Sequence, residues 1–413
     1  TVSFTSLDQY SRLSPFESRV TSFSVLSQPG ALKRVYSVKT DVLLLKDWTW
    51  MPGDAFGILP ENDAEVVRHA LDLLSLEHER VVSVKVIGAV TKESLAEFFS
   101  SYDKPLSVGQ LFTKYLDLTY FPKKACLRHL ADFCTDENEK NILSYLSSKE
   151  GSSTYMKLAG ERTTILDFLS TFKSCKPDLK TLLSYLPLLH PRFYSIANTP
   201  LINPVEIEFV FSTFDYETPE GYPRKGIASS WLENLMLKSS RTLLLVPRPN
   251  LAIFRPPQNP QDPCIMICAG TGIAPFIGFL RHFSAMNAST YSWLFFGFRS
   301  FEHDFLFRSD IETLLAKGTL KKVSIAVSRQ PELGYPKYVQ DAFLQYQHEI
   351  YEMLTLNPTL RIYICGDELT MVKGINDAIV EMICNELRIS QKEAMAISKQ
   401  WTTEGRIVRD VWI

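Results

Sequence analysis

The hydrophobic and polar positions of the chain change their period twice. Near the start, Val35–Val42 and Trp48–Ile58 read as two strand-like runs around a turn at Met51-Pro52-Gly53-Asp54, which lies within the second run. Proline followed by glycine favours a type II turn, because proline presets φ and glycine tolerates a positive φ. We interpret the two runs as the opening hairpin of a β-barrel.

From Asp63 to about Leu189 apolar residues recur three and four positions apart, a spacing typical of helices. The clearest such segments are Ala64–Leu76, Ser94–Tyr102, Leu127–Leu146 and Ile165–Phe172. Strand-like runs then return at Phe193–Ile196, Ile207–Phe214 and Thr242–Val246. Because these are too few to close a sheet without the N-terminal strands, the pattern predicts a barrel split by a helical insertion.

A proline-rich stretch, Pro256–Pro263, is a plausible linker to a second kind of pattern, in which short apolar runs alternate with helical segments. The runs are Cys264–Cys268, Trp293–Phe296, Val323–Val327 and Arg361–Cys365, and the helical segments include Pro275–Phe283, Asp304–Leu315 and Thr370–Leu387. Such alternation predicts a doubly wound parallel sheet covered on both faces. We therefore expect an α/β plus β-barrel chain with a barrel over residues 1–62 and 188–257, a helical connecting domain over 63–187 and an α/β domain over 258–413.

Composition excludes several functions. Lys and Arg number 44 against 46 for Asp and Glu, so the net charge of −2 provides no basic field for nucleic acid. No stretch approaches the ~18 apolar residues of a spanning helix, and no secretion signal is visible. The seven cysteines are scattered without a Cys-x-x-Cys pair, which favours reduced thiols in the cytoplasm and predicts no metal site. Because the chain starts at Thr1, we expect a fragment or a processed form.

A glycine-rich turn, Gly270-Thr271-Gly272, follows the first strand of the α/β part and precedes an apolar helix. Glycines let a backbone approach a pyrophosphate, and a helix N-terminus adds free N–H groups. No Gly-Lys-Ser/Thr follows, so a Walker-type loop is excluded. The alternative is a simple tight turn.

Polar groups gather after the third parallel strand, at Ser328, Arg329, Lys337 and Tyr338. Open α/β sheets bind ligands at the carboxyl ends of their strands, and these groups suit a phosphate monoester. They predict the 2′-phosphate of an NADP-type nucleotide. The alternative is a solvated charged loop.

Four further segments carry candidate chemistry. Cys365 closes the fourth parallel strand, where a cysteine is otherwise small packing, and His190–Ser195 joins an arginine, an aromatic ring and a hydroxyl. Gly226–Ser229 lies at the start of a helix and is a second candidate pyrophosphate-binding site. Trp412 lies where a frayed tail is expected; because an exposed indole is costly, we expect it to stack on something flat.

Together these segments resemble the ferredoxin-reductase-like half of the diflavin reductases. The motifs occur in the family's order: Arg-x-Tyr-Ser, Gly-x-Ala-Ser, Gly-Thr-Gly-x-Ala-Pro-Phe, Ser-Arg, Tyr-Val-Gln, Cys-Gly-Asp and a terminal Trp, over roughly Arg12 to Ile413. Within the family, Pro122–Ala125, Ser174–Pro177 and Gly272–Leu280 look most like the branch that reactivates methionine synthase by reducing its cobalamin. The microsomal cytochrome reductases are the next nearest.

The resemblance implies an NADPH-dependent flavoprotein oxidoreductase that binds FAD and NADPH. It assigns Ser195, Cys365, Asp410 and Trp412 to the catalytic site, the first three orienting the nicotinamide and Trp412 covering the flavin. Arg192 and Gly226–Ser229 would hold the FAD phosphates, and Tyr194 would stack on its ring. The full set of implied cofactor-binding residues is Lys33, Arg192, Phe193, Tyr194, Ser195, Gly226, Ile227, Ala228, Ser229, Gly270, Thr271, Gly272, Arg299, Ser328, Arg329, Lys337, Tyr338, Gln340 and Trp412.

The resemblance also implies partners. The family's flavodoxin-like FMN domain, which passes on single electrons, is expected to be absent from this chain, and methionine synthase is the expected acceptor. A cytochrome or sulfite reductase flavoprotein is the alternative enzyme, and a docking module without flavin is the alternative outside catalysis. Lys337 directly precedes Tyr338, whereas many relatives separate them, and Gly374 stands where relatives often carry Asp.

Overall fold

The computed structural model describes residues 15–43, 49–83, 105–218, 221, 223–238, 241–248 and 254–412. The predicted helix Ser94–Tyr102 and the ends Arg12 and Ile413 lie outside them. The chain divides into two compact units, one containing residues 58–192 and 214–239 and the other residues 15–57, 193–213 and 240–413. The division into three domains expected from the sequence stays a prediction.

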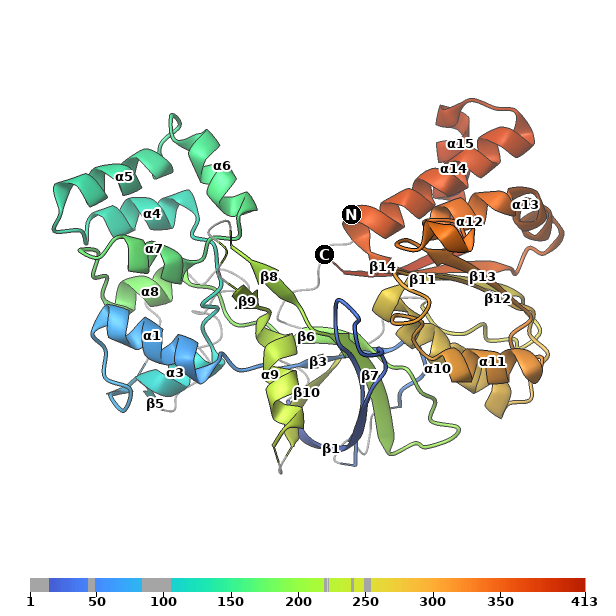
Figure 1. Ribbon diagram of the computed structural model, residues 1–413, viewed down its shortest axis with the longest axis horizontal. Helices are drawn as coiled ribbons and strands as arrows, with labels where there is room; N and C mark the ends of the chain where they lie inside the picture. Colours follow the sequence, from blue (N-terminus) through green and yellow to red (C-terminus); the bar gives the residue numbers. More distant parts are fainter. Residues whose placement is uncertain are drawn as a thin grey trace. The chain divides into compact units, whose positions relative to one another are not determined.

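The barrel is a six-stranded sheet in the order β6-β3-β10-β1-β2-β7 (Figure 1). Its strands are β1 (Phe16–Val25), β2 (Val35–Asp41), β3 (Ala55–Ile58), β6 (Arg192–Ser195), β7 (Glu206–Ser212) and β10 (Thr242–Arg248). Beyond the end of β6, the Ala197 N–H donates to the Glu208 carbonyl on β7 at 2.8 Å. This bond links the two outer strands, so the sheet closes on itself as predicted.

The predicted opening hairpin is wrong. Strand β2 pairs with β1 and β7, whereas β3 lies between β6 and β10. The sequence pattern missed β1 because its register shifts between Val20 and Ser22, which interrupts the alternation, and because most of its residues are exposed. The turn itself is present: Asp54 N–H donates to Met51 O at 3.0 Å, and Gly53 has φ +88°.

The first unit is mainly helical. Its helices are α1 (Ala64–Leu74), α3 (Val108–Lys114), α4 (Lys124–Ala131), α5 (Glu137–Ser147), α6 (Ser152–Gly160), α7 (Ile165–Thr171), α8 (Leu179–Tyr185) and α9 (Ile227–Met236). Two short strand pairs accompany them. Strand β4 (Val81–Val82) pairs with β5 (Leu106–Ser107), and β8 (Asp215–Glu217) pairs with β9 (Pro223–Lys225). The predicted Leu127–Leu146 segment is broken into α4 and α5, because Asp136 caps α5 by accepting from Asn138 and Glu139 N–H groups.

The parallel sheet has the order β13-β12-β11-β14-β15. Its strands are β11 (Cys264–Ala269), β12 (Ser292–Phe298), β13 (Lys322–Val327), β14 (Arg361–Asp367) and β15 (Ile407–Trp412). Helices α10 (Ala274–Ala285) and α11 (Arg308–Ala316) cover one face, and α12 (Val339–Gln345), α13 (Gln347–Leu356), α14 (Lys373–Leu387) and α15 (Gln391–Thr403) cover the other (Figure 1). Alternate residues of β11 enter the two cores, with Met266 in one and Ile267 in the other. The predicted doubly wound sheet is confirmed.

The C-terminal segment is a strand and not a frayed tail. Residues Ile407–Trp412 form β15, which pairs in parallel with β14. Ile407 and Val408 are buried, so the sheet core and the backbone ladder together hold this segment in place.

We expect Gly53→Ala to destabilise the barrel strongly. A Cβ at Gly53 would lie 2.2 Å from the Phe254 carbonyl oxygen, in addition to the cost of a positive φ. Gly334→Ala is the matched control, because Gly334 has φ +73° but open space around its Cβ position. Chemical denaturation should give a loss of about 1–2 kcal/mol for the control and about 1–3 kcal/mol more for Gly53→Ala. Equal losses would contradict the close approach.

Candidate active site

A hydroxyl, a carboxyl and a thiol from three strands meet where the barrel contacts the parallel sheet. Ser195, at the end of β6, donates its hydroxyl to Asp410 Oδ2 at 2.7 Å. Cys365 on β14 is the register partner of Asp410 on β15. The structure thus brings together Ser195, Cys365 and Asp410, which are far apart in sequence.

Burial controls the protonation of this group. It raises the pKa of the Asp410 carboxyl, while the Ser195 hydrogen bond and the positive charge of Arg248 lower it. Burial, and then the charges of Asp410 and Cys268, raise the pKa of the Cys365 thiol well above its usual value. A protonated thiol is a poor nucleophile, so Cys365 suits packing or orientation and not covalent chemistry.

Sequence reasoning missed Arg248. It lies at the end of β10, with its guanidinium carbon 4.9 Å from the centre of the Phe193 ring. The guanidinium group of Arg248 thus lies over the ring of Phe193, a predicted cofactor-binding residue, and its positive charge also lowers the pKa of Asp410. No motif marks Arg248 in the sequence, because its role arises from the adjacency of separate strands.

The glycine turn packs against this group. Gly270–Ile273 form a 3₁₀ turn directly before α10, and Gly270 has φ +54°. A Cβ at Gly272 would lie 2.4 Å from the Cys365 carbonyl oxygen and 3.3 Å from Trp412 Cη2. Glycine at this position therefore allows the turn, Cys365 and the indole to pack together. Trp412 remains 42% exposed, so part of its surface is open to solvent.

The polar groups after β12 and β13 converge through backbone hydrogen bonds. Val327 N–H donates to Pro336 O at 2.9 Å, which places Lys337 near Ser328 in space. Arg329 N–H donates to Arg299 O at 3.0 Å. These bonds bring the backbone of Arg299, Arg329 and Lys337 to one edge of the sheet, and the Ser328 hydroxyl donates there to Phe298 O at 3.4 Å. Residues of these types suit a phosphate monoester.

One aromatic side chain, Tyr338, and one amide side chain, Gln340, come next in the chain. Tyr338 caps α12 and is exposed, and Lys337 Nζ lies 5.0 Å from the centre of its ring. Gln340 packs over Gly374, where a Cβ would lie 3.0 Å from Gln340 Nε2. The missing side chain at Gly374, the departure noted in the sequence, leaves room for Gln340.

The remaining predicted cofactor residues are divided between the two units. In the second unit, the Tyr194 ring lies 5.3 Å from that of Phe209, and Lys33 lies in the β1–β2 connection. In the first unit, Arg192 Nη1 donates to His190 O at 2.7 Å, and Gly226 caps α9. Ser229 Oγ there accepts from Phe214 N–H at 3.2 Å, which orders the turn before Ile227 and Ala228.

Comparisons with known proteins identify the family of the chain. Residues 9–231, more than half of the chain, match the family model described as FAD binding domain. The chain belongs to the FAD binding domain family. Residues 266–377 match the model described as oxidoreductase NAD-binding domain. The prediction of an oxidoreductase with FAD and a nicotinamide nucleotide as cofactors is confirmed at this level.

The FAD-binding chain is similar to full-length reductases along most of its own length. It is 33% identical to human methionine synthase reductase over 433 aligned residues, which cover 96% of the chain and 61% of that protein. It is 33% identical to the mouse protein of that name, with 94% and 60% covered. It is 30% identical to NADPH–cytochrome P450 reductase of Drosophila melanogaster, with 87% and 53% covered. The resemblance to the diflavin reductases is confirmed, and the chain spans about 60% of the first relatives' length.

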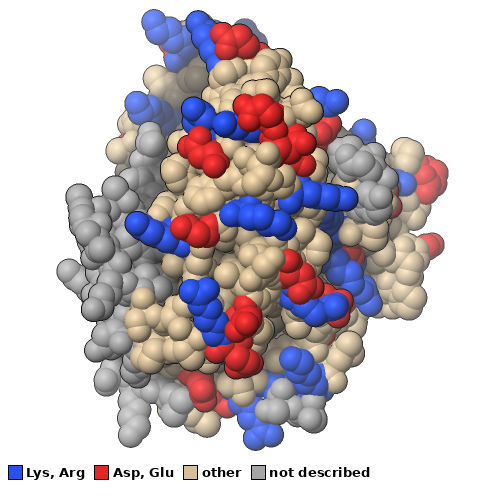
Figure 2. All heavy atoms as spheres, turned by 90° about the vertical axis from the view of Figure 1, so that its left-hand side faces the viewer, with Lys and Arg blue, Asp and Glu red and all other residues tan. Residues whose placement is uncertain are grey.

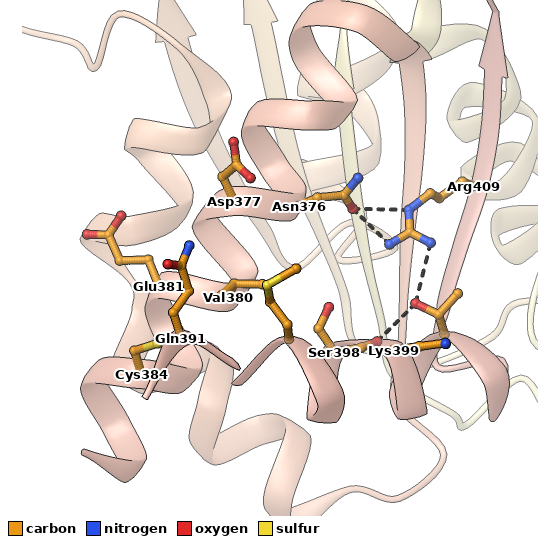
Figure 3. Close-up of a pocket in the computed structure, with 11 residues that line it drawn as sticks. Asn376, Asp377, Val380, Glu381, Cys384, Gln391, Ser398, Lys399 and Arg409 are labelled. Carbon is orange, nitrogen blue, oxygen red and sulfur yellow. Dashed lines mark hydrogen bonds between the residues drawn. The ribbon is translucent and has the colours of Figure 1, made fainter. Parts of the chain in front are cut away.

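In this FAD-binding protein the side of β15 opposite Asp410 is anchored by Arg409. Its Nε and Nη2 atoms donate to Asn376 Oδ1 at 3.1 and 2.8 Å, and Nη1 donates to Thr402 Oγ1 at 3.4 Å (Figure 3). These side chains line a pocket of about 670 Å³ between α14 and α15. Because neighbouring strand residues point to opposite faces, Arg409 ties β15 to two helices while Asp410 faces the barrel.

The described residues also show how charge is distributed on the surface and whether a membrane-spanning helix or a metal site is present. On the face in Figure 2, Lys and Arg side chains lie beside Asp and Glu side chains. The ion pairs of the helical unit include Arg128–Asp132 and Lys157–Glu161. Among the residues that the structure describes, no helix combines the length and apolar character needed to cross a membrane, and no group of three metal-ligating side chains occurs.

We expect Asp410→Asn to change how stability depends on pH. Because the folded-state pKa of Asp410 is raised, the wild type is favoured below its unfolded pKa of about 3.9 and loses stability as pH rises through the folded value. Asn cannot ionise, so melting temperatures measured from pH 4 to 8 should move in favour of the variant as pH rises. Glu312→Gln, on the exposed surface of α11, is the control. A pH-independent difference between Asp410→Asn and wild type would rule out this burial effect.

Proposed function

We propose that the chain is an NADPH-oxidising FAD module that delivers electrons to an FMN partner. One observation carries this proposal: the Ser195–Asp410 hydrogen bond, with Cys365 beside it at the carboxyl edge of the parallel sheet. Ligands of open α/β sheets bind at that edge. The two family matches support the choice of cofactors.

The residues present fit these cofactors. The open backbone at Gly270, with nothing within 4 Å of its Cβ position, leaves space for a pyrophosphate at the turn before α10. Arg329, Lys337 and Ser328 would hold the 2′-phosphate, and Tyr194 would face the flavin ring. When bound, FAD accepts a hydride from the nicotinamide and can release the electrons one at a time.

Each catalytic candidate would act by position. Asp410 accepts from the Ser195 hydroxyl and so holds it in one orientation, and this hydroxyl would hydrogen-bond near the reacting edge of the flavin. The neutral Cys365 thiol fills the space beside it and limits how the nicotinamide can lie. Misplacement of a reacting group by about 1 Å can cost a hundredfold in rate, which makes such positioning worth about 2.7 kcal/mol.

The acceptor is the finer part of the proposal. We propose methionine synthase as the final acceptor, reached through a flavodoxin-like FMN domain, and the cytoplasm as the location. Support comes from relatives named methionine synthase reductase in human, cattle, mouse and rat. The relatives named NADPH–cytochrome P450 reductase support a cytochrome acceptor instead, at lower identity.

The deciding experiment uses the purified chain. We expect a flavin absorption spectrum, bleached under anaerobic conditions by NADPH far faster than by NADH. A colourless protein that does not take up added FAD would support the docking module. A reconstituted assay with separate FMN domains from a methionine synthase reductase and a cytochrome reductase would then distinguish the two acceptors.

We expect Arg329→Ala to weaken NADPH binding selectively. Loss of one charge-assisted phosphate contact, worth ~1.5–3 kcal/mol, should raise the NADPH Kd by at least about tenfold and leave NADH binding unchanged. Titration calorimetry measures both constants. Lys317→Ala, which removes a cation from the C-terminus of α11, is the control. Unchanged affinity for both nucleotides would refute the assignment of Arg329.

We expect Trp412→Ala to relax the choice of nucleotide. The indole lies against Gly272. Where it covers the flavin, as the resemblance implies, a nicotinamide ring would have to displace it to reach the same face. Since stacking is worth about 0.5–1.5 kcal/mol, removing it should raise NADH turnover relative to NADPH by roughly 2- to 13-fold. Steady-state kinetics and melting curves are measured together. A lowered melting temperature with an unchanged turnover ratio would make Trp412 a structural anchor only.

A further inference from the structure

Two cysteines of the helical unit face each other across a single β-bridge. Cys134, in the corner between α4 and α5, pairs with Cys175, in the corner between α7 and α8, as an isolated antiparallel bridge. Lys176 N–H donates to Phe133 O at 3.2 Å, a bond between the residues that flank the pair. This pattern makes Cys134 and Cys175 a non-hydrogen-bonded pair, in which Cα atoms lie about 4.5 Å apart. That spacing falls within the range of about 4.4–6.8 Å that a disulfide spans.

The two thiols converge on one acceptor. Cys134 Sγ lies 3.7 Å and Cys175 Sγ 3.4 Å from the Leu130 carbonyl oxygen, in the last turn of α4. Both sulfur atoms therefore lie next to the same carbonyl oxygen, that of Leu130. The side chains need little rotation to bond to each other.

The backbone around the pair is held in position from both sides. Glu139 accepts from the Lys173 and Ser174 N–H groups at 3.1 and 2.9 Å, and from Ser174 Oγ–H at 2.6 Å. Asp136 N–H donates to Ser174 Oγ at 3.0 Å. These bonds keep the two corners together before any covalent link is made, so closure requires no rearrangement of the chain.

Access differs between the two sulfur atoms. Cys175 is buried, whereas Cys134 is half-buried, so a small reagent reaches Cys134 first. Burial raises the pKa of both thiols, so the thiolate fraction is small and the reaction with an oxidant is slow. The proximity of the two sulfur atoms, and not a high reactivity, is what favours a link between them. A buried partner thiol next to a reachable one is the arrangement in which an oxidised cysteine is resolved within the molecule.

We propose that Cys134 and Cys175 are a modification site that forms a reversible intramolecular disulfide with hydrogen peroxide as the oxidant. The Cys134 sulfur attacks one peroxide oxygen, the O–O bond breaks, and one water leaves as Cys134 becomes a sulfenic acid. The Cys175 sulfur then attacks the Cys134 sulfur, the S–O bond breaks, and the second water leaves. Overall, two thiols are oxidised and one peroxide is reduced to two waters, and a dithiol reductant reverses the reaction.

The link would act on stability and not on the nicotinamide site. It would join the α4–α5 corner covalently to the α7–α8 corner, within the first unit. Ser195, Cys365 and Asp410 belong to the other unit, so their chemistry does not depend on it. The site is therefore independent of the proposed reductase function.

The test treats the reduced, full chain with hydrogen peroxide and removes the excess. Thiol counting under denaturing conditions should fall from seven to five, and non-reducing peptide mapping should find one linked pair, Cys134 with Cys175. Dithiothreitol should restore all seven thiols. Cys134→Ser and Cys175→Ser should each abolish the link, whereas Cys384→Ser, which removes another half-buried thiol, should leave it intact.

Thermal melting provides a second measurement. The oxidised wild type should melt about 5–10 °C above the reduced form, because the link restricts the unfolded chain. Neither single serine variant should show this rise. A link between other cysteines, or Cys134 accumulating as sulfinic acid without a link, would overturn the proposal.

Discussion

The hydrogen bond from Ser195 to Asp410 is the interaction on which the arrangement of the second unit depends. A carboxyl group removed from water is costly unless it is neutralised or paired. Asp410 meets this requirement through the Ser195 hydroxyl and the nearby charge of Arg248, both from the barrel. The barrel and the parallel sheet therefore complete a polar site that neither provides alone.

Other buried polar contacts support that arrangement. Arg281 on α10 donates to the Ala197 carbonyl at 3.1 Å and to Glu208 at 2.7 Å, and on its other side to Asp310 at 2.8 Å. Because α10 follows the glycine turn directly, this network fixes the turn relative to the barrel strand that continues from Ser195. Burial of such charges is tolerated since each one is paired.

Residues that stand at strand ends were predictable from sequence, and residues whose roles depend on strand neighbours were not. Cys365, Ser328 and the glycine turn follow apolar runs, so their position at the carboxyl edge follows from the parallel sheet alone. Strand β1 was not predicted because a register shift interrupts its alternation of buried and exposed residues. Strand β15 was not predicted because charged residues occupy its middle. The roles of Arg248 and Arg409 depend on side chains from other strands and helices that they contact. No local sequence pattern predicts those contacts. The placement of Cys134 opposite Cys175 has the same origin, since it arises from two helix corners meeting.

The sequence distance across the Ser195–Asp410 bond has a kinetic consequence. The two residues are separated by 215 positions, and the barrel and the parallel sheet must both be formed before they can meet. Contacts of such long range form late in folding, because the entropy of ordering the intervening chain must first be overcome. An intermediate in which only the barrel or only the parallel sheet is folded would thus lack the Ser195–Asp410 hydrogen bond. Formation of this bond during refolding would then report the final docking of the barrel against the parallel sheet.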